Sequence, residues 1–325
     1  MTMTHATDQD GQSPGPDPAG GSGTPRRTIT SLPIGLVKAM RPRQWVKNVL
    51  VLAAPFSAGK LLDWHVLPSV ALAFLAFSLA ASGVYLSNDT KDVEADRAHP
   101  TKRNRPIAAG IVPPAVAVAL AVVLFVAALG ISLLAAKNLL VVTAVYIVVQ
   151  LAYCLWLKHE PVIDICIVSS GFLMRAIAGG AAASLPLSPW FLLTMAFGSL
   201  FMASGKRYAE MRLAERTGAK IRKSLERYSA SYLRFVWSLS ATIVIMAYGL
   251  WAFGINTVPG RPVSTWAIVS IVPFVVAVLR YAVDVDGGNG GEPEEIALGD
   301  RVLQVLGLAW VVFLVAAVYL TPALG

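Results

Sequence analysis

Long apolar runs separated by short polar segments dominate the chain from residue 44 onward. Nine of them approach or reach the length of about 20 mostly apolar residues that a helix needs to cross a bilayer. They cover residues 44–62, 65–87, 111–135, 138–157, 161–183, 187–205, 235–255, 264–282 and 302–321. The runs do not alternate between polar and apolar positions, as the strands of a membrane barrel would. The pattern therefore predicts an all-α, polytopic membrane bundle of nine transmembrane helices.

The segment before the first run has a different character. It is rich in Gly, Pro, Ser, Thr and Asp and carries no long apolar run. Such a composition cannot bury enough apolar surface to fold. We therefore expect a disordered tail over residues 1–35 and a single transmembrane catalytic domain over residues 36–325.

Composition and charge agree with a membrane protein. Hydrophobic residues make up 56% of the chain and charged residues only 14%, against about 25% charged residues in soluble domains. With the N-terminus in the cytoplasm, 23 of the 27 Lys and Arg residues fall on the cytoplasmic side, as the positive-inside rule requires. We expect a multi-pass protein of the plasma (inner) membrane with a cytoplasmic active site. Basic residues at a membrane face do not indicate a nucleic-acid partner.

Carboxylates gather where the second run meets the cytoplasm. If the helix continues past residue 87, Asp89, Asp92 and Asp96 lie on one face, with Asn88 beside them. Oxygen-only ligands favour Mg²⁺, which commonly takes further ligands from substrate phosphates. These four residues are the candidate metal ligands, and the alternative is a solvated acidic helix end.

Two cationic segments accompany the carboxylates. Lys102, Arg103 and Arg105 follow them directly, and such a group suits phosphate binding, although positive-inside loops are common. The second segment, after the sixth run, is cationic with one carboxylate. Its candidate substrate-binding residues are Lys206, Arg207, Tyr208 and Glu210.

Polar residues inside apolar runs are further candidates. Lys47 and Asn48 lie in the first run, shortly after Arg43, and Asp164 and Arg175 share a helix face in the fifth run. Intramembrane polar groups tend to be functional. The alternatives are a snorkelling lysine and, for Asp164 and Arg175, a structural pair.

These segments resemble the UbiA-type intramembrane prenyltransferase superfamily. The pattern N-D-x-x-D-x-x-x-D at 88–96, followed by a basic segment that ends in Arg105-Pro106, is typical of it. The nine runs and the two long polar loops, 88–110 and 205–234, agree with this resemblance, which covers roughly residues 38–321. Further resembling stretches are 41–48, 205–211, 292–295 and Asp300-Arg301.

Within the superfamily, the branch that transfers phosphoribosyl groups to polyprenyl phosphates is the most similar. Ordinary members carry a second motif, D-x-x-x-D, after the sixth span, and here that place holds Lys206, Arg207, Tyr208, Glu210 and Arg212. The resemblance implies Mg²⁺ as cofactor, phosphoribosyl pyrophosphate as donor, and a polyprenyl (decaprenyl) phosphate as acceptor, for synthesis of a cell-wall arabinan precursor. It also implies a homo-oligomer, with a trimer suspected.

The resulting hypothesis gives each candidate a role. A Mg²⁺ ion at the four oxygen ligands binds the donor pyrophosphate, so Asp89, Asp92 and Asp96 are catalytic candidates together with Lys47. Lys47 and the cations at 102, 103 and 105 clamp phosphates, while those at 206–208 hold the ribose 5-phosphate. The remaining substrate-binding candidates are Arg43, Asn48, Arg175 and Glu210.

Other classes of function explain less of the sequence. A prenyltransferase acting on an aromatic acceptor is the alternative enzyme, but it would need the second Asp motif. A transporter could line a pathway with Asp164 and Arg175, but has little use for three carboxylates at the membrane surface. A scaffold protein explains none of the charged clusters.

Overall fold

The computed structural model describes residues 31–218, 225–254, 264–287, 296 and 298–320, and this part of the chain is helical with no strand. The all-α prediction is therefore confirmed for the described residues. Of the predicted tail, residues 1–30 lie outside the described part, and residues 31–35 begin helix α1 (Ser31–Met40).

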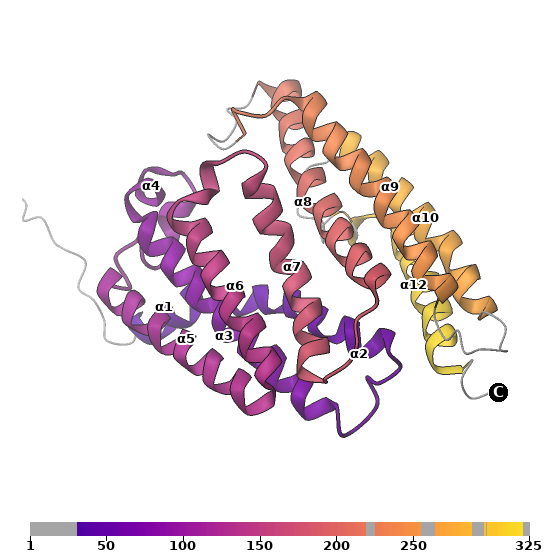
Figure 1. The fold of residues 1–325 in the computed structure, drawn as a ribbon. Helices are drawn as coiled ribbons and strands as arrows, with labels where there is room; N and C mark the ends of the chain where they lie inside the picture. The colour runs from indigo at the N-terminus through magenta and orange to yellow at the C-terminus, as the bar shows by residue number, and fades with distance from the viewer. Residues whose placement is uncertain (1–30, 219–224, 255–263, 288–295, 297, 321–325) are drawn as a thin grey trace, which may run out of the picture.

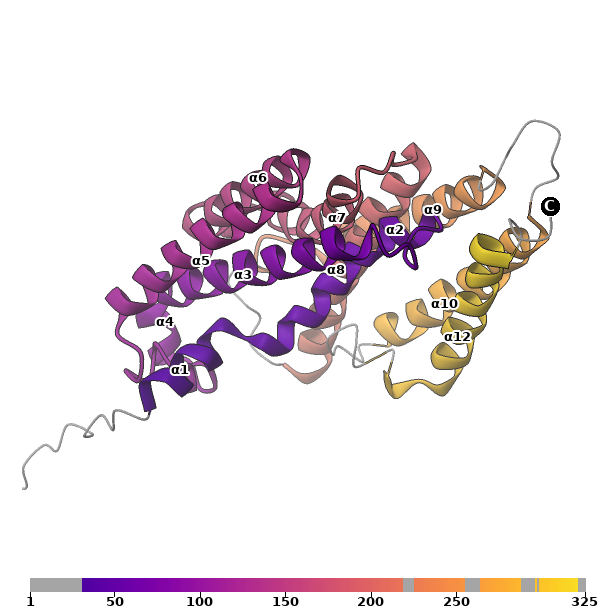
Figure 2. The ribbon, with the colours of Figure 1, turned by 90° about the horizontal axis from the view of Figure 1, so that it is seen from below.

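The N-terminal half forms one bundle. Its long helices are α3 (Leu67–Lys91), α5 (Pro114–Ala135), α6 (Lys137–Leu155) and α7 (Ile163–Ala182). Shorter elements connect them: the 3₁₀-helix η1 (Pro42–Leu52), α2 (Ala53–Ser57), α4 (Val93–Ala98), and the 3₁₀ turns η2 (Lys102–Asn104) and η3 (Leu157–His159). α1 and η1 run beside α3 (Figure 2). Proline opens α3, α5 and η1, where its missing N–H costs nothing and its fixed φ suits a helix.

The C-terminal half contains α8 (Pro189–Thr217), α9 (Ala230–Gly254), α10 (Thr265–Asp286) and α12 (Arg301–Val315), and α12 continues into a short π-helical segment, η4 (Ala316–Leu320). α7 packs on α8 and so joins the halves (Figure 1). Asp300 caps α12 by accepting a hydrogen bond from the Val302 N–H at 2.7 Å. Arg280 donates to the other oxygen of Asp300 at 2.6 Å, and this bond lowers the pKa of the Asp300 carboxyl.

Seven helices in the described part are long and apolar enough to cross a membrane, so the count of nine is not confirmed. The predicted run 187–205 lies in α8, which continues through polar residues to Thr217. The run 44–62 is not one helix, because η1 is wound as a 3₁₀-helix and only the five residues of α2 follow as α-helix.

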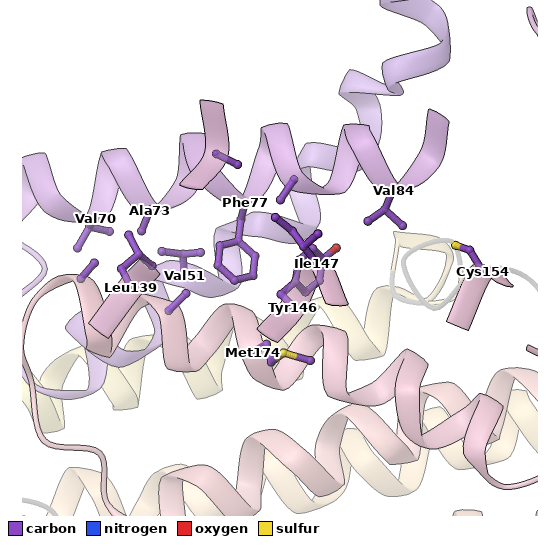
Figure 3. Close-up of a cluster of buried hydrophobic side chains, with 14 residues drawn as sticks. Val51, Val70, Ala73, Phe77, Val84, Leu139, Tyr146, Ile147, Cys154 and Met174 are labelled. Carbon is purple, nitrogen blue, oxygen red and sulfur yellow. The ribbon is translucent and has the colours of Figure 1, made fainter. Parts of the chain in front are cut away.

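A cluster of buried apolar side chains joins η1, α3, α6 and α7 (Figure 3). The ring centroids of Phe77 and Tyr146 lie 4.9 Å apart, and Val51 and Met174 pack around the two rings. The close approach of η1 to α7 depends on Gly179, because a Cβ there would lie 1.8 Å from the Val51 carbonyl oxygen. This packing fixes the path of η1 relative to the helices that carry the polar site.

Candidate active site

The predicted polar segments come together at one end of the bundle. The end of α3 with α4, the connection from α6 to α7, and the C-terminal end of α8 with the start of α9 all lie there (Figure 1). Ion pairs join these segments across long sequence separations. The two polar loops predicted from the sequence thus belong to the same face of the protein.

Asp89 is the centre of a buried ion-pair cluster. One guanidinium nitrogen of Arg41 donates to both its carboxylate oxygens, at 2.7 and 2.8 Å. One nitrogen of Arg105 lies 3.1 Å from Asp89 Oδ1 and 2.7 Å from Asp96 Oδ2. Asp89 is only 2% exposed and Asp96 3%. Buried carboxylates need such partners, since an unpaired charge away from water is strongly unfavourable.

Arg41 reaches Asp89 from an unusual backbone conformation. Its φ and ψ are 55° and 59°, in the left-handed region, and it precedes Pro42, where an extended conformation is usual. Such strain costs on the order of 1 kcal/mol for a non-glycine residue. Its guanidinium also lies 4.9 Å from the ring centroid of Tyr85. The ion pair and this cation–π contact hold the strained turn between α1 and η1.

The helix carrying the carboxylates is interrupted at Asp92. α3 ends at Lys91 and α4 begins at Val93, yet the Asp92 N–H still bonds the Asn88 carbonyl at 2.9 Å and the Asp96 N–H bonds the Asp92 carbonyl at 2.8 Å. The predicted shared face is therefore kept for Asp89 and Asp96. The Asp92 carboxylate instead pairs with Lys158 on η3.

The cluster can be compared with the predicted metal site. Within the described residues, no three His, Cys, Asp or Glu side chains are arranged to hold a metal ion. Asp89 and Asp96 nevertheless converge on a single cation, the Arg105 guanidinium. Carboxylate oxygens suit Mg²⁺. Asp89 and Asp96 are therefore suited to hold the ion at the position that the Arg105 guanidinium occupies. The four-ligand set of Asn88, Asp89, Asp92 and Asp96 stays a prediction.

A second buried cluster surrounds Asp164 at the start of α7. The Tyr228 hydroxyl donates to Asp164, and an Arg207 nitrogen lies 3.2 Å from its other oxygen. Burial raises the pKa of the Tyr228 hydroxyl, and the hydrogen bond to Asp164 raises it further. Val162 precedes the cluster with φ 69°, a strained conformation for a β-branched residue, and its N–H bonds the Tyr228 hydroxyl.

Tyr208 lies in a third cluster, facing α9 and α10. Its hydroxyl donates to Asp286 at 2.7 Å and accepts from two nitrogens of Arg234, at 2.9 and 2.6 Å. Arg207 and Tyr208 are neighbours in the sequence but point to different partners. An open pocket of about 550 Å³ adjoins Tyr208, Arg212 and Arg234.

Asn48 and Arg175 meet in the interior of the bundle. Arg175 Nε donates to Asn48 Oδ1 at 2.7 Å, and Asn48 Nδ2 donates to Ser78 Oγ at 2.9 Å. The other guanidinium nitrogens bond the Gly171 carbonyl at 2.6 Å and the Tyr146 hydroxyl at 3.3 Å. Arg175 and Asp164 share helix α7 but have different partners, so they do not pair with each other.

The remaining predicted residues differ in exposure. Arg43 and Arg103 are exposed, and the half-buried residues are Lys47, Asn88, Lys102, Lys206 and Glu210. Arg41, Lys158 and Tyr228 were not among the predicted site residues. Arg41 belongs to the resembling stretch 41–48, which was a usable signal. Lys158 and Tyr228 are isolated polar residues in the sequence, and their partners come close to them only in the folded protein.

The chain belongs to the UbiA prenyltransferase family, whose sequence model matches residues 49–298. It is thus a multi-pass membrane transferase of this family. The decaprenyl-phosphate phosphoribosyltransferase of Mycolicibacterium smegmatis is 61% identical to it over 308 residues, which cover 92% of this chain and 95% of the relative. The decaprenyl-phosphate phosphoribosyltransferase of Mycobacterium tuberculosis is 62% identical over 292 residues, covering 89% and 95%.

The fold is also similar to solved structures. A UbiA homologue from Archaeoglobus fulgidus bound to GPP and Mg²⁺ superposes with a TM-score of 0.65 at 13% identity, covering 87% of this chain and 98% of that one. At such low identity the likeness concerns the fold alone, and it confirms a UbiA-like helical bundle.

Proposed function

We propose that this protein transfers the 5-phosphoribosyl group of phosphoribosyl pyrophosphate to decaprenyl phosphate and releases pyrophosphate. The observation that carries this proposal is the identity of 61% and 62%, over nearly the full length, to two decaprenyl-phosphate phosphoribosyltransferases. Cationic side chains from three separate segments, Arg41, Arg105 and Lys158, surround the carboxylates. That arrangement suits substrates that both carry phosphate groups.

The reaction breaks the bond between the anomeric carbon of the ribose and a pyrophosphate oxygen. A bond from that carbon to an oxygen of the lipid phosphate forms, and the electron pair of the broken bond leaves with pyrophosphate. The attacking oxygen is already anionic at neutral pH, so no general base is needed. The ribose carbon develops oxocarbenium character, as in glycosyl transfer generally, and a single displacement inverts its configuration.

The carboxylate cluster is the proposed site for the leaving group. Mg²⁺ bound by Asn88, Asp89, Asp92 and Asp96 would neutralise the charge that develops on pyrophosphate. Arg105 already contacts Asp89 and Asp96 and lies where it can pair with a phosphate oxygen. Further phosphate contacts are assigned to Lys47, Lys102 and Arg103.

The segment at the end of α8 is proposed to bind the rest of the donor. Lys206, Arg207 and Tyr208 hold the ribose 5-phosphate, with Glu210 close by. Arg43 is proposed to contact substrate at the membrane face. The lipid tail lies among the helices, with its phosphate at the cytoplasmic end. The protein is proposed to lie in the plasma membrane with its N-terminus in the cytoplasm, as a homo-oligomer for which a trimer is the proposed form.

Prenyl transfer to an aromatic acceptor is the second candidate. It is favoured by one observation, the similarity in fold to a UbiA homologue that binds GPP and Mg²⁺. Against it, α8 carries Lys206, Arg207 and Arg212 where that reaction needs a second pair of aspartates. Those cations suit a donor with an additional phosphate.

Pyrophosphate release by the purified protein distinguishes the two candidates. We expect release with phosphoribosyl pyrophosphate, a polyprenyl phosphate and Mg²⁺ together, and none when the lipid is omitted. Release with geranyl diphosphate and an aromatic acceptor instead would contradict the proposal and support prenyl transfer.

Replacing Lys206 by alanine tests the assignment of the donor site. A charge-assisted hydrogen bond contributes about 1.5–3 kcal/mol, so KM for phosphoribosyl pyrophosphate should rise about 10- to 100-fold. KM for the lipid should change little. Lys60→Ala is the matched control, because Lys60 precedes α3, outside the polar site, and pairs with nearby Asp63 at 3.6 Å. A larger effect on the lipid KM would point to an acceptor role for Lys206.

A further inference from the structure

The 3₁₀-helix η1 presents three distinct faces along its length. Arg43, Val46 and Val49 are exposed, and Asn48 and Val51 are buried on a face that also carries the half-buried Trp45. The third face, at 44, 47 and 50, is half-buried. From residue 43 to residue 51, the exposed positions recur every third residue, in keeping with the three residues per turn of a 3₁₀-helix.

The buried face is tied to α3 by side-chain hydrogen bonds. Trp45 Nε1 donates to Ser82 Oγ at 3.0 Å, and Asn48 Nδ2 donates to Ser78 Oγ at 2.9 Å. The two donors are three residues apart on η1, whereas their acceptors are four apart on α3. Three residues of a 3₁₀-helix rise about 6 Å, as do four residues of an α-helix, so the spacing of the two donors matches the spacing of the two acceptors.

Arg175 anchors the same face from α7. It is 6% exposed, and its Nε donates to Asn48 Oδ1, which is itself fully buried. The Gly171 carbonyl and the Tyr146 hydroxyl accept from its other nitrogens. Arg175 therefore connects η1, α6 and α7 through one rigid guanidinium group, and its burial leaves it little freedom to follow a substrate.

We propose that Arg175 is a positioning residue that holds η1 in its 3₁₀ winding and so keeps Lys47 on the half-buried face. Lys47 is adjacent to Asn48, and it shares its face with Gln44, one 3₁₀ turn earlier. In an α-helical winding, position 47 would instead join position 43 on the exposed face. The catalytic role of Lys47 rests on the proposed function, but the positional role of Arg175 does not.

Spin labels test the winding without any assay of activity. Single nitroxides at 46, 47, 49 and 50, in the full-length protein with Cys154 and Cys166 replaced, report side-chain mobility in lipid nanodiscs. We expect 46 and 49 to be more mobile than 47 and 50. With Arg175→Gln, we expect this difference to disappear or reverse. An unchanged difference would overturn the proposal.

Two further variants make the result specific. Arg280→Gln is the matched control, because it removes an Arg Nε bond of 2.6 Å on α10 and should preserve the mobility pattern. Ser78→Ala removes the other partner of Asn48 and is a milder change, so it should reduce the mobility difference in a protein that still folds. If Arg175→Gln does not fold, a full mobility difference in Ser78→Ala overturns the proposal instead.

Kinetics then test whether Arg175 acts through Lys47. Misplacing a catalytic group can cost about 100-fold in rate, so Arg175→Gln and Lys47→Ala should each lower kcat/KM by a factor of that order. The double variant should be no slower than Lys47→Ala alone, because the two changes remove the same contribution. If the two losses in kcat/KM multiply in the double variant, Arg175 acts independently of Lys47. If the wild-type protein released no pyrophosphate, only the proposed function would fail, since the spin-label result stands separately.

Discussion

Replacing Asp89 by asparagine should lower the rate of pyrophosphate release by about 100- to 1,000-fold, the usual loss when one electrostatic partner of a developing charge is removed. Asparagine preserves the shape of the side chain but not its charge. Arg41 and Arg105 both bond this carboxylate, so Arg41 would lose its anionic partner and Arg105 would keep only Asp96. A predicted ligand of Mg²⁺ would be weakened at the same time.

The measurement is turnover at saturating donor, lipid and Mg²⁺, with thermal unfolding as a check that the variant is folded. Asp63→Asn is the matched control, because Asp63 pairs with Lys60 in the segment before α3 and should keep its activity. Turnover of Asp89→Asn within about threefold of wild type would correspond to less than 1 kcal/mol of transition-state stabilisation. Such a result would remove Asp89 from the proposed mechanism.

Gly179→Ala should destabilise the protein by about 3 kcal/mol, the upper range for overpacking a well-packed interior. The new Cβ would lie 1.8 Å from the Val51 carbonyl oxygen and 2.8 Å from its carbon. Those are backbone atoms, so no side-chain rotation can relieve the clash and η1 must move away from α7. Helix propensity favours alanine by about 1 kcal/mol, so the expected loss of stability comes from packing alone.

Gly130→Ala on α5 is the control for this prediction. Apart from the backbone of its own helix and its chain neighbours, no heavy atom of the described residues lies within 4 Å of a Cβ at that position, so the variant should be as stable as wild type or slightly more so. Thermal unfolding in one detergent measures both variants. Equal midpoints for Gly179→Ala and Gly130→Ala would contradict the described packing of η1 on α7.

The sequence predicted the fold class because apolar run length is a local property that sets which segments become long helices. Seven runs correspond to helices that meet the length and hydropathy needed to cross a membrane. The run 44–62 is the weakest of the nine predicted spans, because it contains Lys47, Pro55 and Gly59. Its 3₁₀ winding depends on contacts from Asn48 to Ser78 and Arg175, which lie far away in the sequence. No local pattern of hydrophobicity reports such contacts.

The candidate site was predictable in part for a similar reason. Asp89 and Asp96 share a face because helical spacing is local, and the structure brings Arg105 between them. Lys158 and Tyr228 could not be assigned partners, since Asp92 and Asp164 are more than 60 residues away from them. Arg175 was expected to bind substrate, whereas its burial and its neutral hydrogen-bond partners suit the positioning role proposed above.

The winding of η1 also changes how far a short stretch of chain extends. Eleven residues of 3₁₀-helix extend about 22 Å, because each residue rises about 2.0 Å and not the 1.5 Å of an α-helix. Laid end to end with the five residues of α2, this segment measures about 30 Å, the thickness of the hydrocarbon layer of a bilayer. Sixteen residues therefore match a depth for which an α-helix requires twenty, although this segment is not among the seven described helices long enough to cross a membrane.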